Sequence, residues 1–291
     1  MRNLILSVLA AILAASAHAG PILLSIGADP NGVPRTLDGI PKAGSTSEIS
    51  SLGDGSFGFF GLTFRTDDGR LYTIQLDSSF NSSLASVAAD GTGLTSVLPL
   101  SGAAYNGGLA WQSGNIFFAI GLTSSFHEEL HRIDAGSSGD TTLNTDLGVD
   151  FTGGLTFGAD GNLYAISNGV DGVTASVVII DPVTGTILQT AVLPGGRYDG
   201  GLFFDSTDNF FYTIQTDSSG VSSLFRFEFA PSINPTLVRS DIGVGFDNAA
   251  LTSASAATSV PEPGTWMLVG GALLVLLAKH ARNHKRSEER Q

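Results

Sequence analysis

The stretch Gly154-Leu155-Thr156-Phe157, followed by the turn Asp160-Gly161 and the apolar run Asn162-Leu163-Tyr164-Ala165-Ile166, is one copy of a pattern that recurs along the chain. Similar copies start at Gly61-Leu62, Gly108-Leu109 and Gly201-Leu202, and a weaker one starts at Ala250-Leu251. The leucines are 47, 46, 47 and 49 residues apart. A period in the forties with several short strands per unit is typical of β-propeller blades.

Each repeat contains turn residues at equivalent places. Between the first and second expected strands stand pairs that tolerate positive φ in a tight turn: Asp68-Gly69, Ser113-Gly114, Asp160-Gly161 and Asp208-Asn209. A third strand then leads into a second turn, seen best as Val177-Val178-Ile179-Ile180 before Asp181-Pro182-Val183-Thr184-Gly185. Strands such as 162–166 are apolar on both faces, which fits a small sheet packed between two neighbouring sheets.

The ends of the repeat region predict a closed ring. Residues 23–32 match a third strand and its turn without the preceding hairpin, whereas Ala250-Leu251 matches a first strand without the rest. One blade shared by the two ends would close the circle and remove exposed sheet edges. We therefore expect an all-β propeller of about five blades, with an open β-solenoid as the structural alternative.

The charge of the repeat region limits its partners. Between residues 20 and 260 there are 24 acidic and 8 basic side chains, a net charge of −16. This excess disfavours nucleic acid, since phosphate binding needs clustered Lys and Arg. The sequence predicts no cofactor and no metal site; calcium stays open as a ligand, although no D-x-[DN]-x-[DN]-G loop occurs. Cysteine is absent, so no disulfide contributes to stability.

The C-terminal residues have the features of a membrane-anchored signal. Val260-Pro261-Glu262-Pro263 precedes the apolar segment 266–278, and a basic cluster follows it: Lys279, Arg282, Lys285 and Arg286. The prolines interrupt any helix before the apolar run, and the positive charges resist crossing the membrane. The run is shorter than the ~20 residues that a bilayer usually requires, so Lys279 would extend toward the interface. An ordinary C-terminal anchor is the alternative interpretation.

This order of elements resembles the PEP-CTERM sorting domain of exported Gram-negative proteins, which exosortase-type membrane peptidases recognise. The resemblance covers residues 260 to about 286. It implies that residues 260–263 are the recognition and processing element, that 266–278 is the transmembrane helix, and that the four basic residues are the cytoplasmic stop. It also implies an exosortase-type peptidase as a partner and suggests exopolysaccharide as another.

The N-terminus independently predicts export. A basic start, Met1-Arg2-Asn3, precedes an apolar run and the small-x-small motif Ala17-His18-Ala19 of signal peptidase cleavage. The predicted organisation is a signal peptide (1–19), a propeller (20–251), a flexible linker (252–259) and the sorting signal (260–291). The protein would first be anchored in the inner membrane facing the periplasm, and then reach the cell surface or the extracellular space.

One motif in the repeat region has the form of a zinc site. His127-Glu128-Glu129-Leu130-His131 matches H-E-x-x-H, in which an α-helix places both imidazoles about 6 Å apart with Glu as general base. The repeat register instead places residues 130–133 in a third strand, where the two histidines would stand about 13 Å apart. We therefore expect no catalytic residues in this motif.

Polar residues precede the expected first strands by three to five positions: Asn106, Asp150, Asp199 and Asp247. First strands line the central channel of a propeller, so these side chains are the candidate ligand site if they converge at its mouth. The alternative is that each caps its loop through Asx-type hydrogen bonds.

Two functions from different classes follow. The favoured one is a non-catalytic propeller that serves as a binding or structural module of the cell envelope or extracellular matrix. The other is a secreted propeller enzyme, a lyase or hydrolase, acting on a carbohydrate or small metabolite at the channel mouth. Convergence of Asp150, Asp199 and Asp247 in a pocket with perturbed pKa values would favour the enzyme.

Overall fold

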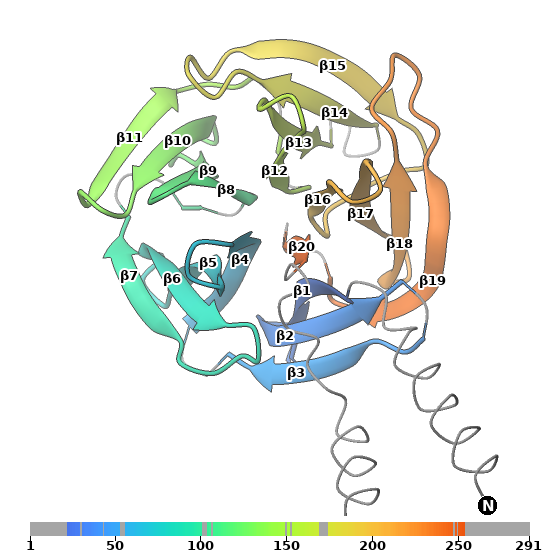
Figure 1. Cartoon of the computed structure of the whole chain (residues 1–291), viewed down its shortest axis with the longest axis horizontal. Coiled ribbons are helices and arrows are strands. Elements are labelled where there is room, and N and C mark those ends of the chain that lie inside the picture. Colours follow the sequence, from blue (N-terminus) through green and yellow to red (C-terminus); the bar gives the residue numbers. More distant parts are fainter. Residues whose placement is uncertain are drawn as a thin grey trace, which may run out of the picture. The chain divides into compact units, whose positions relative to one another are not determined.

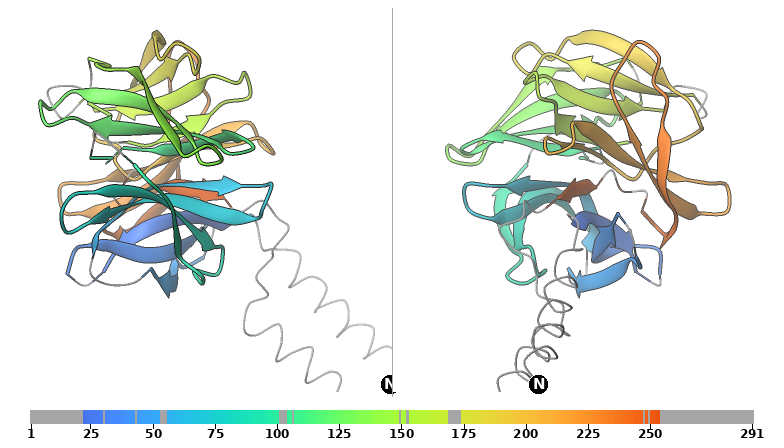
Figure 2. Two further views of the ribbon diagram at one scale, coloured as in Figure 1. Left: turned by 90° about the vertical axis from the view of Figure 1, so that its left-hand side faces the viewer. Right: turned by 45° about the vertical axis from the view of Figure 1, so that its right-hand side comes forward.

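The computed structural model describes residues 22–253 apart from 30, 43, 53–55, 101–103, 106, 149, 152, 169–173, 247 and 249. These residues form five antiparallel four-stranded sheets arranged as blades around a central axis, a five-bladed β-propeller (Figure 1). The side views show the sheets stacked face to face around the ring (Figure 2). The predicted propeller and its blade number are confirmed.

Each blade runs from an inner first strand to an outer fourth strand. The strands of blades 1 and 2 are β4 (Ser56–Arg65), β5 (Arg70–Asp77), β6 (Ser82–Ala88), β7 (Thr95–Pro99), β8 (Leu109–Ser113), β9 (Ile116–Leu122), β10 (Glu128–Asp134) and β11 (Gly139–Asn144). Those of blades 3 and 4 are β12 (Leu155–Phe157), β13 (Leu163–Ser167), β14 (Ala175–Ile180), β15 (Ile187–Leu193), β16 (Leu202–Asp205), β17 (Phe210–Thr216), β18 (Val221–Phe227) and β19 (Thr236–Val244). Those of blade 5 are β20 (Leu251–Ser253), β1 (Ile22–Ala28), β2 (Pro34–Pro41) and β3 (Ser47–Ser51).

Blade 5 closes the ring with strands from both ends of the described chain. β20 pairs antiparallel with β1, with Leu24 opposite Thr252, and the Ser25 hydroxyl donates to the Ala250 carbonyl at 2.5 Å. The split blade is thus confirmed, and the open solenoid is excluded because the first and last strands share one sheet.

Two expectations about blade 5 were wrong. Residues 23–28 form the second strand of the blade, and β2 is the third. The error has a local cause: the turn after β1 has the same Asp-Pro and Gly chemistry as the turn after the third strand of blade 3, so the two turns look alike in sequence. In addition, β20 continues to Ser253 and buries Thr252, so the first two residues assigned to the linker belong to the blade.

The turns between first and second strands follow the sequence prediction. Their second residue has positive φ in each case: Gly69, Gly114, Gly161 and Asn209. In three blades the aspartate of this turn accepts a hydrogen bond from a tyrosine four residues later, which ties the turn to the second strand. The donors are Tyr72, Tyr164 and Tyr212.

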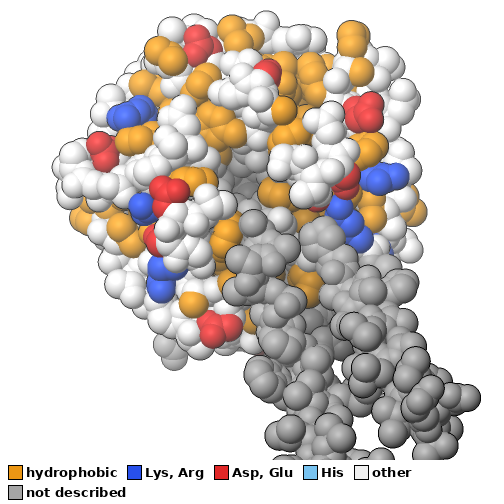
Figure 3. All heavy atoms as spheres, viewed as in Figure 1, with side chains coloured by type: hydrophobic (Ala, Val, Ile, Leu, Met, Phe, Trp, Pro, Cys, Tyr) orange, Lys and Arg blue, Asp and Glu red, His pale blue; other side chains and the backbone are white. Residues whose placement is uncertain are grey.

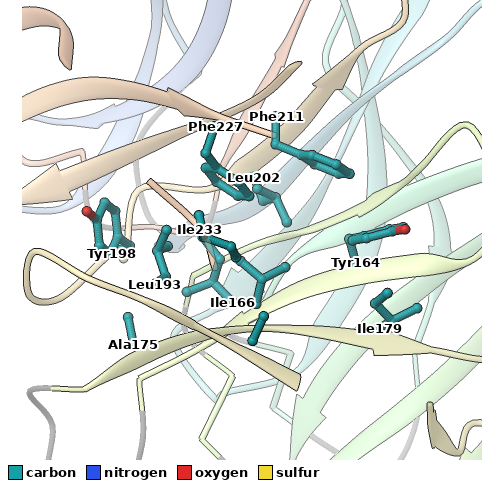
Figure 4. Packing of buried hydrophobic residues seen from close by; sticks show 12 residues of the cluster. Tyr164, Ile166, Ala175, Ile179, Leu193, Tyr198, Leu202, Phe211, Phe227 and Ile233 are labelled. Carbon is teal, nitrogen blue, oxygen red and sulfur yellow. The ribbon is translucent and has the colours of Figure 1, made fainter. Parts of the chain in front are cut away.

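The hydrophobic core lies between adjacent blades, as expected for strands that are apolar on both faces. All five residues of β13 are buried. One side of this blade packs against blade 4, where Ile166 and Tyr164 meet Leu202, Phe211 and Phe227 (Figure 4). The other side, through Leu163 and Ala165, packs against blade 2. Burial of aromatic and aliphatic side chains between sheets therefore holds neighbouring blades together.

Glycines just before the leucines of the first strands allow the blades to meet at the axis. A Cβ added to Gly108 would lie less than 3.0 Å from the backbone of Leu155 in the next blade. The same holds for Gly61 against Leu109, and for the other two members of the series, Gly154 against Leu202 and Gly201 against Leu251. The circle is completed by a parallel bridge between Leu62 and Ala250. The Gly-Leu phrase of the repeat is thus explained by backbone contact between successive first strands.

The targeting segments fall outside this part of the chain. The described residues contain no helix with the length and hydrophobicity needed to cross a bilayer. The expected signal peptide, the segment 266–278 and its basic cluster lie outside the described residues.

Candidate functional site

The loops that enter the first strands and the turns between second and third strands lie at the same end of the ring, because adjacent strands of a blade are antiparallel. We call this end the loop face. A hydrogen bond joins the two kinds of segment in blade 3: the Asn168 amide N–H, after the second strand, donates to the carbonyl of Asp150 in the loop that enters the first strand, at 3.0 Å. Asp150 and Asp199, the two predicted polar residues that the structure describes, therefore belong to this face.

The structure gives Asp150 and Asp199 different environments. Asp199 is buried, accepts a hydrogen bond from the Asn168 side-chain amide at 2.7 Å, and forms an ion pair with Arg197 at 2.5 Å. The Asn168 side chain also accepts from the backbone N–H of Tyr198 at 3.1 Å. Asp199 thus connects the loop entering blade 4 to blade 3. This structural role is close to the alternative hypothesis, in which each polar residue caps its loop through hydrogen bonds. The Asp150 residue, in contrast, is exposed.

The four predicted residues do not occupy one position of the repeat. A buried aromatic residue anchors each loop that enters a first strand: Tyr105, Phe151, Tyr198 and Phe246. Asn106, Asp199 and Asp247 follow their aromatic anchor, whereas Asp150 precedes Phe151. Asp150 and Asp199 therefore stand at different positions of the repeat. Asn106 and Asp247 lie outside the described residues, so convergence of the whole set stays a prediction.

The H-E-x-x-H segment is a β-strand, as predicted. Glu128 to Asp134 form β10, the third strand of blade 2, and pair with β9 and β11. His127 precedes the strand and is half exposed, with Nδ1 3.2 Å from the Asp146 carboxylate. The His131 ring is buried, and its two nitrogens face Asp140 at 3.0 Å and Glu129 at 3.1 Å. The helical geometry of a zinc peptidase is contradicted.

His131 belongs to a buried network with Tyr105. The Tyr105 hydroxyl donates to the Asp140 carboxylate at 2.6 Å and lies 2.9 Å from His131 Nδ1. Burial, followed by the charge of Asp140, raises the pKa of Tyr105 well above its usual value, so this hydroxyl stays protonated. The network fixes the loop entering blade 2 to the third and fourth strands of the same blade.

Replacing Tyr105 by Phe is expected to lower the free energy of unfolding by about 2 kcal/mol, because a hydrogen bond to a charged group is lost and its buried partners remain. Urea unfolding followed by circular dichroism measures the change. Tyr198→Phe is the matched control: its hydroxyl donates to the uncharged Pro194 carbonyl, so we expect a loss of about 1 kcal/mol. Equal losses of unfolding free energy in the two variants would show that the charge of the Asp140 carboxylate does not strengthen the hydrogen bond from Tyr105.

Glu128 is the unusual ionisable group of the loop face. Its side chain is buried, one carboxyl oxygen interacts with the Phe151 backbone N–H, and Oε2 has no hydrogen-bond partner in the described part of the chain. Burial, and next the nearby charge of Asp150, raise the pKa of Glu128 to about 8. At neutral pH this side chain is largely a neutral carboxylic acid beside an exposed aspartate. Sequence reasoning missed it, since only its position in the zinc motif was considered.

Within the residues that the structure describes, no three His, Asp or Glu side chains group as a metal ion would require. The face seen in Figure 3 carries Lys and Arg side chains interspersed with Asp and Glu. What the loop face can offer chemically is therefore a neutral carboxyl group, an exposed carboxylate and polar loops.

The fold and this face define the chain as a five-bladed β-propeller. Among solved structures it is similar to a chain of the nidogen/laminin complex, with a TM-score of 0.54 and 14% identity over 82% of this chain and 100% of that one. It is also similar to TolB from Acinetobacter baumannii, with a TM-score of 0.52 and 9% identity over 76% of this chain. The match spans about half of the TolB chain, 53%. These identities show a shared fold alone, and no family model or curated protein matches the sequence.

Proposed function

We propose that this protein is an exported propeller that acts without catalysis as a binding or structural module of the cell envelope or extracellular matrix. In this proposal an exosortase-type peptidase processes it at residues 260–263, after anchoring in the inner membrane through 266–278. The observation that carries the proposal is the position of the closed ring within the chain. Its strands begin at Ile22, just after the expected cleavage site, and end at Ser253, shortly before the Pro-Glu-Pro triplet. The five sheets close into a ring within these residues, which supports the proposal that the segments on either side serve in targeting.

The sorting signal is tested by replacing Pro261-Glu262-Pro263 with three alanines. We expect the variant to accumulate in the inner membrane with its C-terminus intact, because the peptidase has lost its recognition element. Membrane fractionation and intact-mass measurement, in cells with and without an exosortase-type peptidase, give the readout.

The matched control replaces Thr258 and Ser259 by alanine, which alters the adjacent segment and leaves the triplet unchanged. The control should be processed like the wild type. If the triple-alanine variant matures normally, or if maturation does not depend on the peptidase, the sorting assignment is refuted and an ordinary anchor replaces it.

One observation favours the second candidate, a secreted propeller lyase or hydrolase. Glu128 and Asp150 are two nearby carboxyl groups of which one is neutral at pH 7 because of burial, and such differences mark acid and base roles in enzymes. The test is incubation of the full-length protein with a panel of polysaccharides and measurement of new chain ends. Activity that is lost in Glu128→Gln would establish the enzyme; no activity in either protein leaves the binding module as the function.

A further inference from the structure

The turn between second and third strands has one hydrogen-bonding pattern in four blades. The first residue accepts from the backbone N–H of the fourth residue, and its own N–H donates to the carbonyl of the fifth. The four turns begin at Asp29, Asp77, Thr123 and Asp217. In blade 3 the corresponding residues lie largely outside the described chain.

The fourth residue of this turn has a left-handed backbone. In blades 5 and 4 it is glycine, with φ of 79° at Gly32 and 80° at Gly220. In blades 1 and 2 it is phenylalanine, with φ of 61° at Phe80 and 62° at Phe126. Bulky residues rarely adopt this conformation, which costs on the order of 1 kcal/mol or more. Blades 1 and 2 thus accept strain at a position where glycine fits without it.

Both of these phenylalanine side chains are exposed. Phe80 is 60% exposed and Phe126 is 83% exposed, although phenylalanine is normally a core residue in this protein. Strain in a loop together with an exposed aromatic ring indicates a functional surface. The two rings come from equivalent turns of adjacent blades, so both lie on the loop face in neighbouring blades.

Both phenylalanines line one groove of about 460 Å³ between blades 1 and 2. Its remaining wall combines the apolar side chains of Leu100, Ala104 and Leu122 with the hydroxyl and amide groups of Asn81, Ser82, Thr123 and Ser124. None of these lining residues is ionisable, although the chain as a whole carries a net charge of −13. The described lining residues therefore offer a charged ligand no counter-charge.

We propose that this groove binds a neutral saccharide. Sugar rings combine an apolar C–H face, which stacks on an aromatic ring, with hydroxyl groups that exchange hydrogen bonds with Ser, Thr and Asn. The groove offers these two kinds of surface and no charge. The inference rests on the proposed non-catalytic binding function and deepens it by naming the ligand class and the residues that hold it.

The experiment uses the full-length protein in a detergent without a sugar head group. Binding is first screened on an array of neutral and charged oligosaccharides. The affinity for the neutral sugar that binds best is then measured by calorimetry. Phe80→Gly and Phe126→Gly are expected to weaken binding at least tenfold each, and the double variant to abolish it. The melting temperature should stay the same or rise, since glycine relieves the positive φ. This stability readout separates loss of the site from loss of the fold.

Val183→Gly is the matched control, because Val183 is 79% exposed and lies in a turn after a third strand, at the opposite end of the ring. It should bind like the wild type. The proposal is overturned if no neutral sugar binds, if the double glycine variant binds normally, or if the phenylalanines instead mediate adhesion to neutral lipid vesicles or an apolar peptide. Processing of the double variant at residues 260–263 is measured separately, so failure of the sugar site and failure of the sorting assignment are distinguishable.

Discussion

Gly108→Ala is expected to lower the free energy of unfolding by about 3 kcal/mol, at the upper end of the range for overpacking a well-packed site. The added methyl group would overlap the backbone of Gly154 and Leu155 in the next blade, and backbone cannot move aside as a flexible side chain can. Relief would require blade 2 to rotate away from blade 3 and open the core between them. Thermal and urea unfolding followed by near-ultraviolet circular dichroism measure the loss.

Gly114→Ala is the control for this substitution. Gly114 lies in the turn between the first and second strands of the same blade, and an added Cβ would meet nothing within 4 Å. Only its positive φ opposes alanine, at a cost of about 1 kcal/mol. If Gly108→Ala loses no more stability than Gly114→Ala, the first strands do not meet at the axis in the way described above.

Glu128 should make the stability of the protein fall as pH rises from about 5 to 8. The folded state holds the proton on this buried carboxyl up to a pKa of about 8, whereas the unfolded chain releases it near the ordinary value of 4.5. Between these two pKa values the folded state binds more protons than the unfolded chain. The stabilisation from this proton is therefore fully present below pH 4.5 and is lost as the pH rises through about 8. Glu128→Gln has no ionisable group at this position, so its stability lacks this pH-dependent contribution. We expect it to match the wild type at pH 5 and to exceed its free energy of unfolding by on the order of 3 kcal/mol at pH 8.5.

Urea unfolding at half-unit steps of pH gives the difference curve between the wild type and Glu128→Gln. Asp150→Asn should reduce the fall, because removing the neighbouring negative charge lowers the pKa of Glu128. Glu228→Gln, at an exposed glutamate, should leave the curve unchanged. A flat difference curve for Glu128→Gln would mean that the carboxyl is solvated in the folded protein, and the enzyme candidate would lose its supporting observation.

Local sequence chemistry predicted most of the fold because each blade repeats the same short turns and antiparallel pairings of strands that follow one another in the chain. The regular spacing of the leucines predicts one first strand per blade, at Leu62, Leu109, Leu155, Leu202 and Leu251. Turns such as Asp160-Gly161 need only two residues with suitable backbone preferences. The strand at 130–133 followed from the same register and excluded a helical zinc motif. The second strand of blade 5 was misplaced because its turn resembles a different turn of the repeat.

The candidate site was predicted less well, because its properties come from residues of different blades. Asp150 and Asp199 both stand a few residues before the leucine of a first strand, yet only the Asp199 side chain accepts a hydrogen bond from the Asn168 side chain of the neighbouring blade. The signal that could have revealed Phe80 and Phe126 is present in the sequence, as phenylalanine where Gly32 and Gly220 stand in other blades. Reading it requires knowing that the four turns share one backbone conformation.

The sequence alone predicted a β-repeat of about five blades and an acidic repeat region, since these depend on composition, spacing and short motifs; the targeting segments at both ends stay predictions. The tertiary structure was needed to show that Glu128 is buried beside Asp150 and that two exposed phenylalanines share one uncharged groove. The physical reason is that burial and electrostatic coupling arise from atoms brought together by the closure of the ring. No local stretch of the chain contains that information.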